Sequence, residues 1–252
     1  MAYFSGQGKI FVAKSVNGVV QGGFRWVGNV PDFKPSFDNS NIEHKESYSG
    51  ARLLDKVVTT EIKAKISATL EEWSKENLAL AVRGATQTVT AGSVAVGTPE
   101  AFPSGLVAGS LVPLKYQNVS AVVIKDSAGT PATLAATTNY TVQADTGMIT
   151  IVDPGAFVQP FKASYTYAAG ESTPFFSTAA NEVALRFEGV NTANNNQKVI
   201  VEIYRVALDP TKELGLISSD FASFVLEGNA LVDPTKPSND AVFGQFGRLI
   251  LL

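Results

Sequence analysis

The chain of 252 residues contains no cysteine and a single histidine, His44. Without cysteine there is no disulfide, no thiolate-bound zinc or iron–sulfur site and no cysteine nucleophile. One histidine cannot build a multi-histidine metal site, and it leaves a histidine-based catalytic triad only one candidate base. The sequence also has no G-x-S-x-G nucleophile motif and no P-loop. We therefore expect no catalytic residue, no metal and no cofactor, and the chain is not predicted to be an enzyme.

Charged side chains are also scarce, at 17% of the residues against about 25% in an average soluble domain. The 20 Lys+Arg and 23 Asp+Glu give a net charge of −3, so the chain lacks the basic balance of a sequence-reading nucleic-acid binder. No stretch approaches the roughly 18 apolar residues of a membrane span. Residues 1–8 lack the basic and apolar regions of a signal peptide. We expect a soluble protein made in a cytoplasm.

The clearest strand pattern covers residues 57–70, where apolar or small side chains at even positions alternate with mostly polar ones at odd positions. Such alternation is typical of a strand with one buried and one solvated face. Nearer the start, Asn17-Gly18 separates two apolar runs and predicts a hairpin with a two-residue type I′ turn. These signals favour a mainly β fold.

One helix is expected after residue 70. Thr69 and Glu72 have the spacing of a capping box, and Gly84 is a plausible terminator. The helix would lie on a sheet with Trp73 as its main anchor. The side chains at helical spacing on the sheet-facing side are Leu70, Trp73, Leu80 and Ala81, with Asn77 as the polar exception.

Residues 31–55 are polar and rich in turn-forming residues, so we expect a long irregular segment. Such a segment is uncommon inside a compact domain unless it has a function. By default it is a surface loop; the alternative is an arm that orders against a neighbouring molecule. His44 lies here among charged residues, either as a solvated side chain or in a pH-sensitive or interface role.

The composition changes over residues 85–170, which hold only seven charged side chains. Strands are expected there at residues 119–125, 139–143, 148–152 and 161–167, with a hairpin turn at Asp145-Thr146-Gly147. We predict an inserted small β module at residues 91–170 and a core domain made of residues 1–90 and 171–252. In the last part of the chain, strands are expected at residues 183–188, 199–208, 221–231 and 243–252. Residues 199–208 are apolar on both faces, which indicates a central strand.

Several stretches, in their order along the chain, resemble a phage major tail tube protein of the long-tailed, siphovirus-like kind. They are residues 43–47 with Ser49-Gly50, strand 57–70, residues 70–72 and 75–79, residues 139–150 and 164–168, and residues 187–191, 208–210, 216–222 and 231–234. The resemblance covers most of the chain and rests on the order of motifs that are individually short.

The resemblance implies a tail-tube-type β-sandwich, able to form a barrel, with one flanking helix and the inserted β module. Proteins of this family assemble into hexameric rings that stack into a tube around a tape-measure protein, and double-stranded DNA later passes through the lumen. The expected partners are therefore the chain itself, the tape-measure protein, the tail terminator and the distal tail or baseplate proteins, in a virion tail assembled in the bacterial cytoplasm. Six subunits with four strands each, at about 4.8 Å spacing and about 40° tilt, would give a barrel roughly 50 Å across.

The resemblance also suggests where subunits meet. A long loop of these proteins reaches the next ring, and residues 31–55 occupy the matching place. The candidate contact residues are Asp38, Glu43, His44, Lys45, Glu46, Ser47 and Tyr48. A lumen needs a wet, mixed or acidic lining, because a basic one would hold phosphates. The odd face of strand 57–70 is a candidate for it, through Glu61, Lys63 and Lys65; its default interpretation is a solvated sheet face.

Two further functions remain open at the level of the sequence. A tube protein of a contractile injection system would also assemble into stacked rings, but it would not transport a genome. A carbohydrate- or surface-binding β protein could stack sugars on aromatic side chains such as Trp26, Tyr48 and Tyr140.

Overall fold

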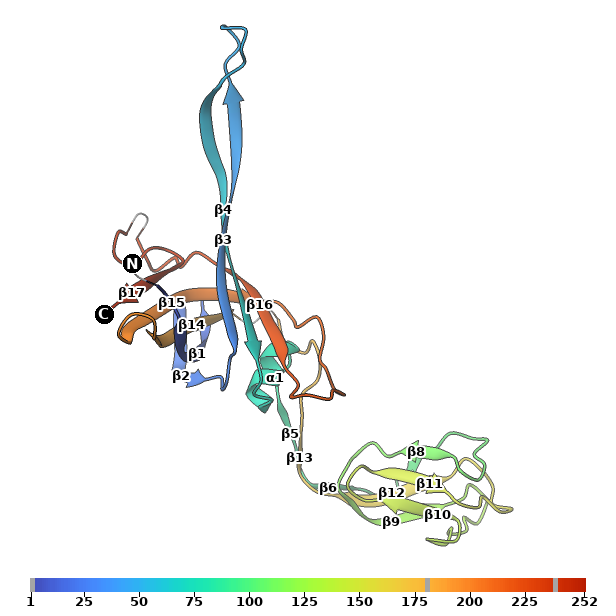
Figure 1. Cartoon of the computed structure of the whole chain (residues 1–252). Helices are drawn as coiled ribbons and strands as arrows, with labels where there is room; N and C mark the ends of the chain where they lie inside the picture. Colours follow the sequence, from blue (N-terminus) through green and yellow to red (C-terminus); the bar gives the residue numbers. More distant parts are fainter. Residues whose placement is uncertain (1–2, 180–181, 238–239) are drawn as a thin grey trace. The chain divides into compact units, whose positions relative to one another are not determined.

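The computed structural model describes residues 3–179, 182–237 and 240–252. The chain is mainly β, with several antiparallel sheets and one short helix, as the sequence predicts. It forms two compact units: unit 1 is Met1–Thr86 together with Thr173–Leu252, and unit 2 is Gln87–Ser172 (Figure 1).

Unit 1 is built on one eight-stranded antiparallel sheet in the order β2-β1-β14-β15-β16-β4-β3, with β17 also paired to β15. Its central strand is β15, which pairs with β14 on one side and with β17 and then β16 on the other. This confirms the central position predicted for residues 199–208. The strands are β1 (Gly6–Val16), β2 (Val19–Trp26), β3 (Asp32–Lys45), β4 (Leu54–Leu70), β14 (Glu182–Asn191), β15 (Gln197–Leu208), β16 (Phe224–Ala230) and β17 (Gly247–Leu251).

The turn between β1 and β2 has the predicted geometry. Asn17 and Gly18 have φ values of 50° and 83°, and Val16 and Val19 face each other on either side of them. A type I′ turn needs positive φ at both central positions, a conformation that Asn and Gly adopt at low cost. The Asn-Gly pair therefore fixes the register of this hairpin.

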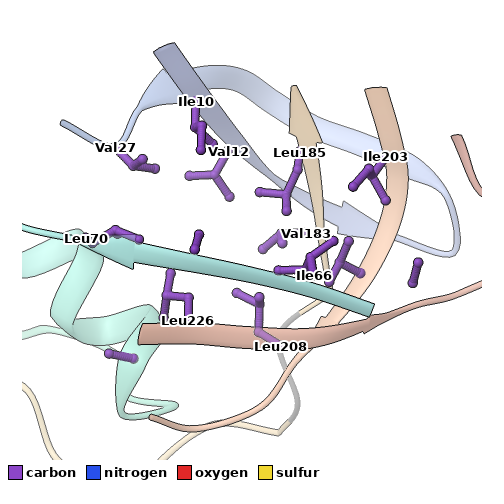
Figure 2. Close-up of a cluster of buried hydrophobic side chains, with 14 of the residues drawn as sticks. Ile10, Val12, Val27, Ile66, Leu70, Val183, Leu185, Ile203, Leu208 and Leu226 are labelled. Carbon is purple, nitrogen blue, oxygen red and sulfur yellow. The ribbon is translucent and has the colours of Figure 1, made fainter. Parts of the chain in front are cut away.

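The core of unit 1 lies between the inner faces of the curled sheet (Figure 2). In β4, Ala64, Ile66, Ala68 and Leu70 are buried while the intervening residues are not, which confirms the alternation predicted for that half of the strand. They meet apolar side chains from β1, β14, β15 and β16, of which Ile10, Val12, Val183, Leu185, Ile203, Leu208 and Leu226 are labelled in Figure 2.

Helix α1 (Lys75–Ala81) is shorter than predicted and begins later. The predicted capping box is wrong, because Thr69 and Leu70 are still in β4, where Leu70 pairs with Phe224. Ser74 is the N-cap, and its side chain accepts a hydrogen bond from the backbone of Asn77. The helix ends before Gly84, and the left-handed residue beyond it is Arg83, at φ 48°.

Two side chains, Trp73 and Asn77, connect the helix region to the rest of unit 1. The Trp73 ring meets Phe224 edge-on at 5.8 Å, and its indole N–H donates to the carbonyl of Ala222. Asn77, the polar exception on the apolar side, is fully buried. It accepts from Arg25 at 2.7 Å and donates to the carbonyls of Val27 and Glu72. Each polar group of this buried amide is therefore paired.

Unit 2 is a small β-sandwich with its own core. One sheet has the order β10-β11-β8 and the other has β6, β7 and β9 all paired to β12. Phe161, Ile124, Ile149 and Ile151 are fully buried between them. A further antiparallel pair, β5 with β13, lies where the chain enters and leaves the unit. The strands are β5 (Gln87–Val89), β6 (Gly92–Val94), β7 (Glu100–Ala101), β8 (Leu111–Pro113), β9 (Val119–Lys125), β10 (Tyr140–Gln143), β11 (Met148–Ile151), β12 (Lys162–Tyr167) and β13 (Gly170–Ser172).

The prediction of an irregular segment at residues 31–55 is wrong. Residues 32–45 form strand β3, which pairs with β4 from Asp32↔Thr69 out to Lys45↔Leu54. Asn, Asp and Pro are depleted in strands, so the long ladder to β4 holds the backbone extended. What the composition indicated as a loop is one arm of a β-hairpin.

Candidate assembly interface

The β3–β4 hairpin extends beyond the other strands of unit 1 as a two-stranded ribbon (Figure 1). From Ser36 to Lys63, only Glu46 is buried, and every other side chain is exposed. An isolated two-stranded ribbon is marginally stable in water. A ribbon of this length therefore points to a partner that covers it.

The exposed ribbon carries an unusual number of large apolar side chains. Ile42 and Val58 lie directly opposite each other, so their side chains share one face. Phe37 and Ile62 share the face of the core residues of β4 and continue it outward. The exposed apolar residues are Phe37, Ile42, Tyr48, Leu53, Leu54, Val57, Val58 and Ile62. So many exposed apolar side chains on one hairpin indicate an interaction site.

The tip of the hairpin is ordered around one carboxylate. Glu46 is 4% exposed and accepts hydrogen bonds from the backbone N–H groups of Tyr48, Ser49 and Leu53, and from the hydroxyl of Ser49. These bonds, led by that of the Ser49 hydroxyl, lower the pKa of Glu46 to about 2. With the carboxylate satisfied inside the loop, Tyr48 stands out at 88% exposure.

The other predicted contact residues all lie on this hairpin. His44 Nδ1 is 2.5 Å from Asp55 Oδ1 on the facing strand, and both side chains are exposed. Asp38 lies opposite Lys63 in the ladder. Glu43, Lys45 and Ser47 are exposed. The structure therefore brings the predicted set together on one ribbon, with Glu46 shaping the tip and the others on its surface. Their contact with another subunit stays a prediction.

The predicted lumen residues lie on the β4 face that points away from the core. Lys63 pairs with Glu61 at 2.8 Å, and this bond raises the pKa of the Lys63 ammonium, with a further contribution from Asp38. Lys65 lies one step nearer the core and opposite Asn229. All three are exposed, and their lining of a channel stays a prediction.

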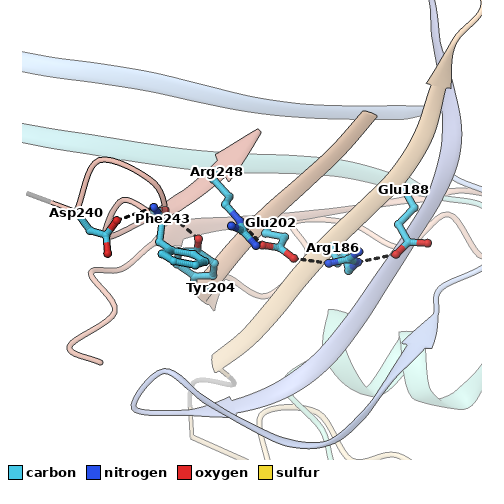
Figure 3. A network of polar contacts seen from close by, with 7 residues as sticks. All are labelled: Arg186, Glu188, Glu202, Tyr204, Asp240, Phe243 and Arg248. Atoms are coloured by element: carbon cyan, nitrogen blue, oxygen red, sulfur yellow. Dashed lines mark hydrogen bonds and ion pairs between the residues drawn. The ribbon is translucent and has the colours of Figure 1, made fainter. Parts of the chain in front are cut away.

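A second charged face was missed by the sequence reasoning (Figure 3). Arg186, Glu202 and Arg248 stand directly opposite one another on β14, β15 and β17. Glu202 accepts from both arginines, with Arg248 Nε at 2.7 Å, and Arg186 also donates to Glu188 at 2.6 Å. The alternation of charged with apolar residues at 183–188 was the available signal, but it could not show which strands would lie side by side.

Between the two walls of the curled sheet the core opens into a groove of about 1290 Å³. Its lining includes Phe37 and Ile66 from the hairpin side and Ile10, Val201 and Leu249 from the other strands. At its base, the rings of Phe33 and Phe187 stack at 6.2 Å. The groove is larger than the roughly 300–1,000 Å³ typical of small-molecule pockets.

A pair of glycines shapes the groove wall. Gly8 and Gly189 face each other across β1 and β14. A Cβ on Gly189 would lie 2.4 Å from the carbonyl of Gln7 and 2.4 Å from the Phe187 ring. Only glycine allows the ring to lie this close over the strand pair.

Across the described residues, no group of three or more Asp, Glu or His side chains is placed to hold a metal ion. No helix in the described part of the chain is long and apolar enough to cross a membrane.

A model of one protein family, described as "Protein of unknown function UCP028589", matches residues 3–250. No curated protein matches the chain.

Proposed function

We propose a structural role for this chain, which belongs to the family of unknown function UCP028589: it self-assembles into stacked hexameric rings that form a phage tail tube. In this role the tube encloses a tape-measure protein and later conducts double-stranded DNA without binding it specifically. The tail terminator and the distal tail proteins close its two ends.

The observation that carries the proposal is the exposed apolar ribbon with an ordered tip. Eight large apolar side chains from Phe37 to Ile62 are exposed, although β3 is paired with β4 from Asp32 to Lys45, with register shifts at Ser40/Asn41 and His44/Lys45. Burying such side chains is favourable by about 1.5–3 kcal/mol each relative to full exposure. A chain that keeps them ordered and exposed is suited to permanent association with other copies.

The sheet of unit 1 adds two supporting features. Among the described strands, β2, β3 and β17 each pair on one side only, and open edges are sites where another chain can add a strand. The face with Arg186, Glu188, Glu202 and Arg248 carries two positive and two negative charges. Such a charge-balanced face is an alternative to Glu61, Lys63 and Lys65 for a channel lining that does not retain DNA.

A shortened hairpin tests the proposal. Residues 41–60 are replaced by Asn-Gly, which joins Ser40 to Glu61, two residues that face each other in the parent ladder. The chain already contains this turn at Asn17-Gly18. Because the deleted residues are exposed apart from Glu46, the urea unfolding curve should be nearly unchanged. Sedimentation should then show rings or monomers in place of stacks. Stacks as long as those of the parent would contradict the proposal.

A further inference from the structure

The groove of unit 1 has mainly apolar walls, and nothing in the described chain fills it. Its lining also includes the charged residues Lys9, Asp32, Lys65, Glu188, Glu202 and Arg248. Leu249 and Leu251 face Val201 and Val199 on the core side of β17 and β15, yet they are 62% and 58% exposed. On the opposite wall Phe37 is 81% exposed. The core of unit 1 is therefore complete at its closed end and uncovered at its open end.

The hairpin of the same molecule cannot fill this space. Its base forms one wall of the groove through Phe33, Pro35, Ala64 and Ile66. The exposed stretch from Asp38 to Lys45 spans roughly 26 Å at about 3.3 Å per residue. Returning the tip to its own groove would break the β3–β4 ladder.

The distal hairpin has the properties that the groove requires of an occupant. It carries exposed apolar side chains, Ile42, Tyr48, Leu53 and Val58, that the apolar part of the groove can cover. It is a preformed β element, so docking costs little conformational entropy. Within the described residues, β17 pairs only with β15, so an incoming strand also meets free N–H and C=O groups at the rim.

We propose that the groove receives the distal hairpin, residues 41–58, of a second copy of this chain. The contact rests on the proposed self-assembly and specifies its geometry. Donor and acceptor are different surfaces, so the interface is heterologous: each copy fills one groove and has its own groove filled. Repetition of this contact builds an open series of subunits, which is the arrangement that stacked rings need.

Cross-linking tests the contact directly, because the parent chain has no cysteine. The variant Tyr48→Cys with Leu249→Cys places one thiol on the tip and one in the groove. Both positions are exposed, so neither change should impair folding. A short bis-maleimide should convert this variant into a ladder of covalent dimers and longer chains, and each single-cysteine variant should give dimers at most.

Two further double-cysteine variants complete the experiment: one is a control, and the other tests a different occupant of the groove. Tyr48→Cys with Val225→Cys keeps the tip thiol but moves the second one to β16, opposite Thr69 of β4 and outside the groove. Its ladder should be several-fold weaker. Leu216→Cys with Leu249→Cys tests another exposed apolar segment of unit 1, where Ile217 and Phe221 are 98% exposed. A strong ladder from this pair, with none from Tyr48→Cys/Leu249→Cys, would assign the groove to that loop and overturn the proposal.

Electron microscopy of the cysteine-free parent distinguishes a wrong assignment of the groove from a wrong proposed function. If the parent forms rings or stacks but the tip and groove thiols do not cross-link, only the assignment of the groove is wrong. If the parent stays monomeric at high concentration, the proposed function is wrong and the groove assignment falls with it.

Discussion

Replacement of Ile42 and Val58 by threonine removes apolar contact from the hairpin while keeping its shape. The two side chains face each other across β3 and β4. Threonine is also β-branched, so the strand preference of both positions is retained. The change therefore separates what the ribbon contacts from how the ribbon folds.

The structure sets the size of the effect. Ile42 is 63% exposed and Val58 is 48% exposed in the single chain. With about 2 kcal/mol for complete burial of each side chain, covering these fractions stabilises the contact by roughly 2 kcal/mol per hairpin. This corresponds to a weakening of about 30-fold in the association constant. The buried hydroxyl groups would add to the loss.

Sedimentation velocity over a range of concentrations measures this shift, and urea unfolding shows whether the subunit is intact. Unfolding should change by less than about 0.5 kcal/mol, as is usual at exposed sites. The matched control is Val96→Thr with Val107→Thr, two side chains of unit 2 that are 65% and 64% exposed; it should assemble like the parent. If the hairpin variant assembles at the parent's concentration, the reasoning that the ribbon is a contact surface is refuted.

Three other substitutions test separate parts of the structure. Asn77→Ala removes three hydrogen bonds of a buried amide and leaves Arg25 without its acceptor, so urea unfolding should show a loss of about 2–4 kcal/mol; a loss below 0.5 kcal/mol would argue against the buried network. The order of the tip should be complete above pH 4.5 and lost as the pH falls through about 2, because folding lowers the pKa of Glu46. The NMR amide signal of Tyr48 reports this loss of order as the pH is lowered. The variant Glu46→Gln should broaden the same signal already at pH 7. A sharp signal in that variant would contradict the role of Glu46 in ordering the tip. Phe161→Ala should destabilise unit 2 by about 3–5 kcal/mol in thermal unfolding, and it should leave self-assembly unchanged, because the hairpin and the groove belong to unit 1.

The sequence was most informative where local chemistry determines the backbone. Asn17-Gly18 predicts a type I′ turn because few other pairs tolerate two positive φ angles, and the structure has this turn. The alternation in residues 64–70 predicts a strand with one buried face, and that face is the core of unit 1. In both cases the deciding interactions are close together in the chain.

The prediction for residues 31–55 was wrong because a strand that is distant in the sequence determines their conformation. Residues 32–45 have the composition of a loop, but pairing with β4 makes them a strand. The same alternation that is buried at residues 64–70 continues to Ile62, which is 66% exposed, because no other described strand of unit 1 covers it. The groove could not be predicted from the sequence for the same reason, because Phe37 and Leu249, which both line it, are more than 200 residues apart.

Negative-stain electron microscopy of the purified, unaltered chain is the most direct measurement of the central claim. Self-assembly through the hairpin and the open sheet edges should give rings with a stain-filled centre and, at higher concentration, stacks of these rings. Monomers that persist at high concentration, or aggregates without a central channel, would contradict the account.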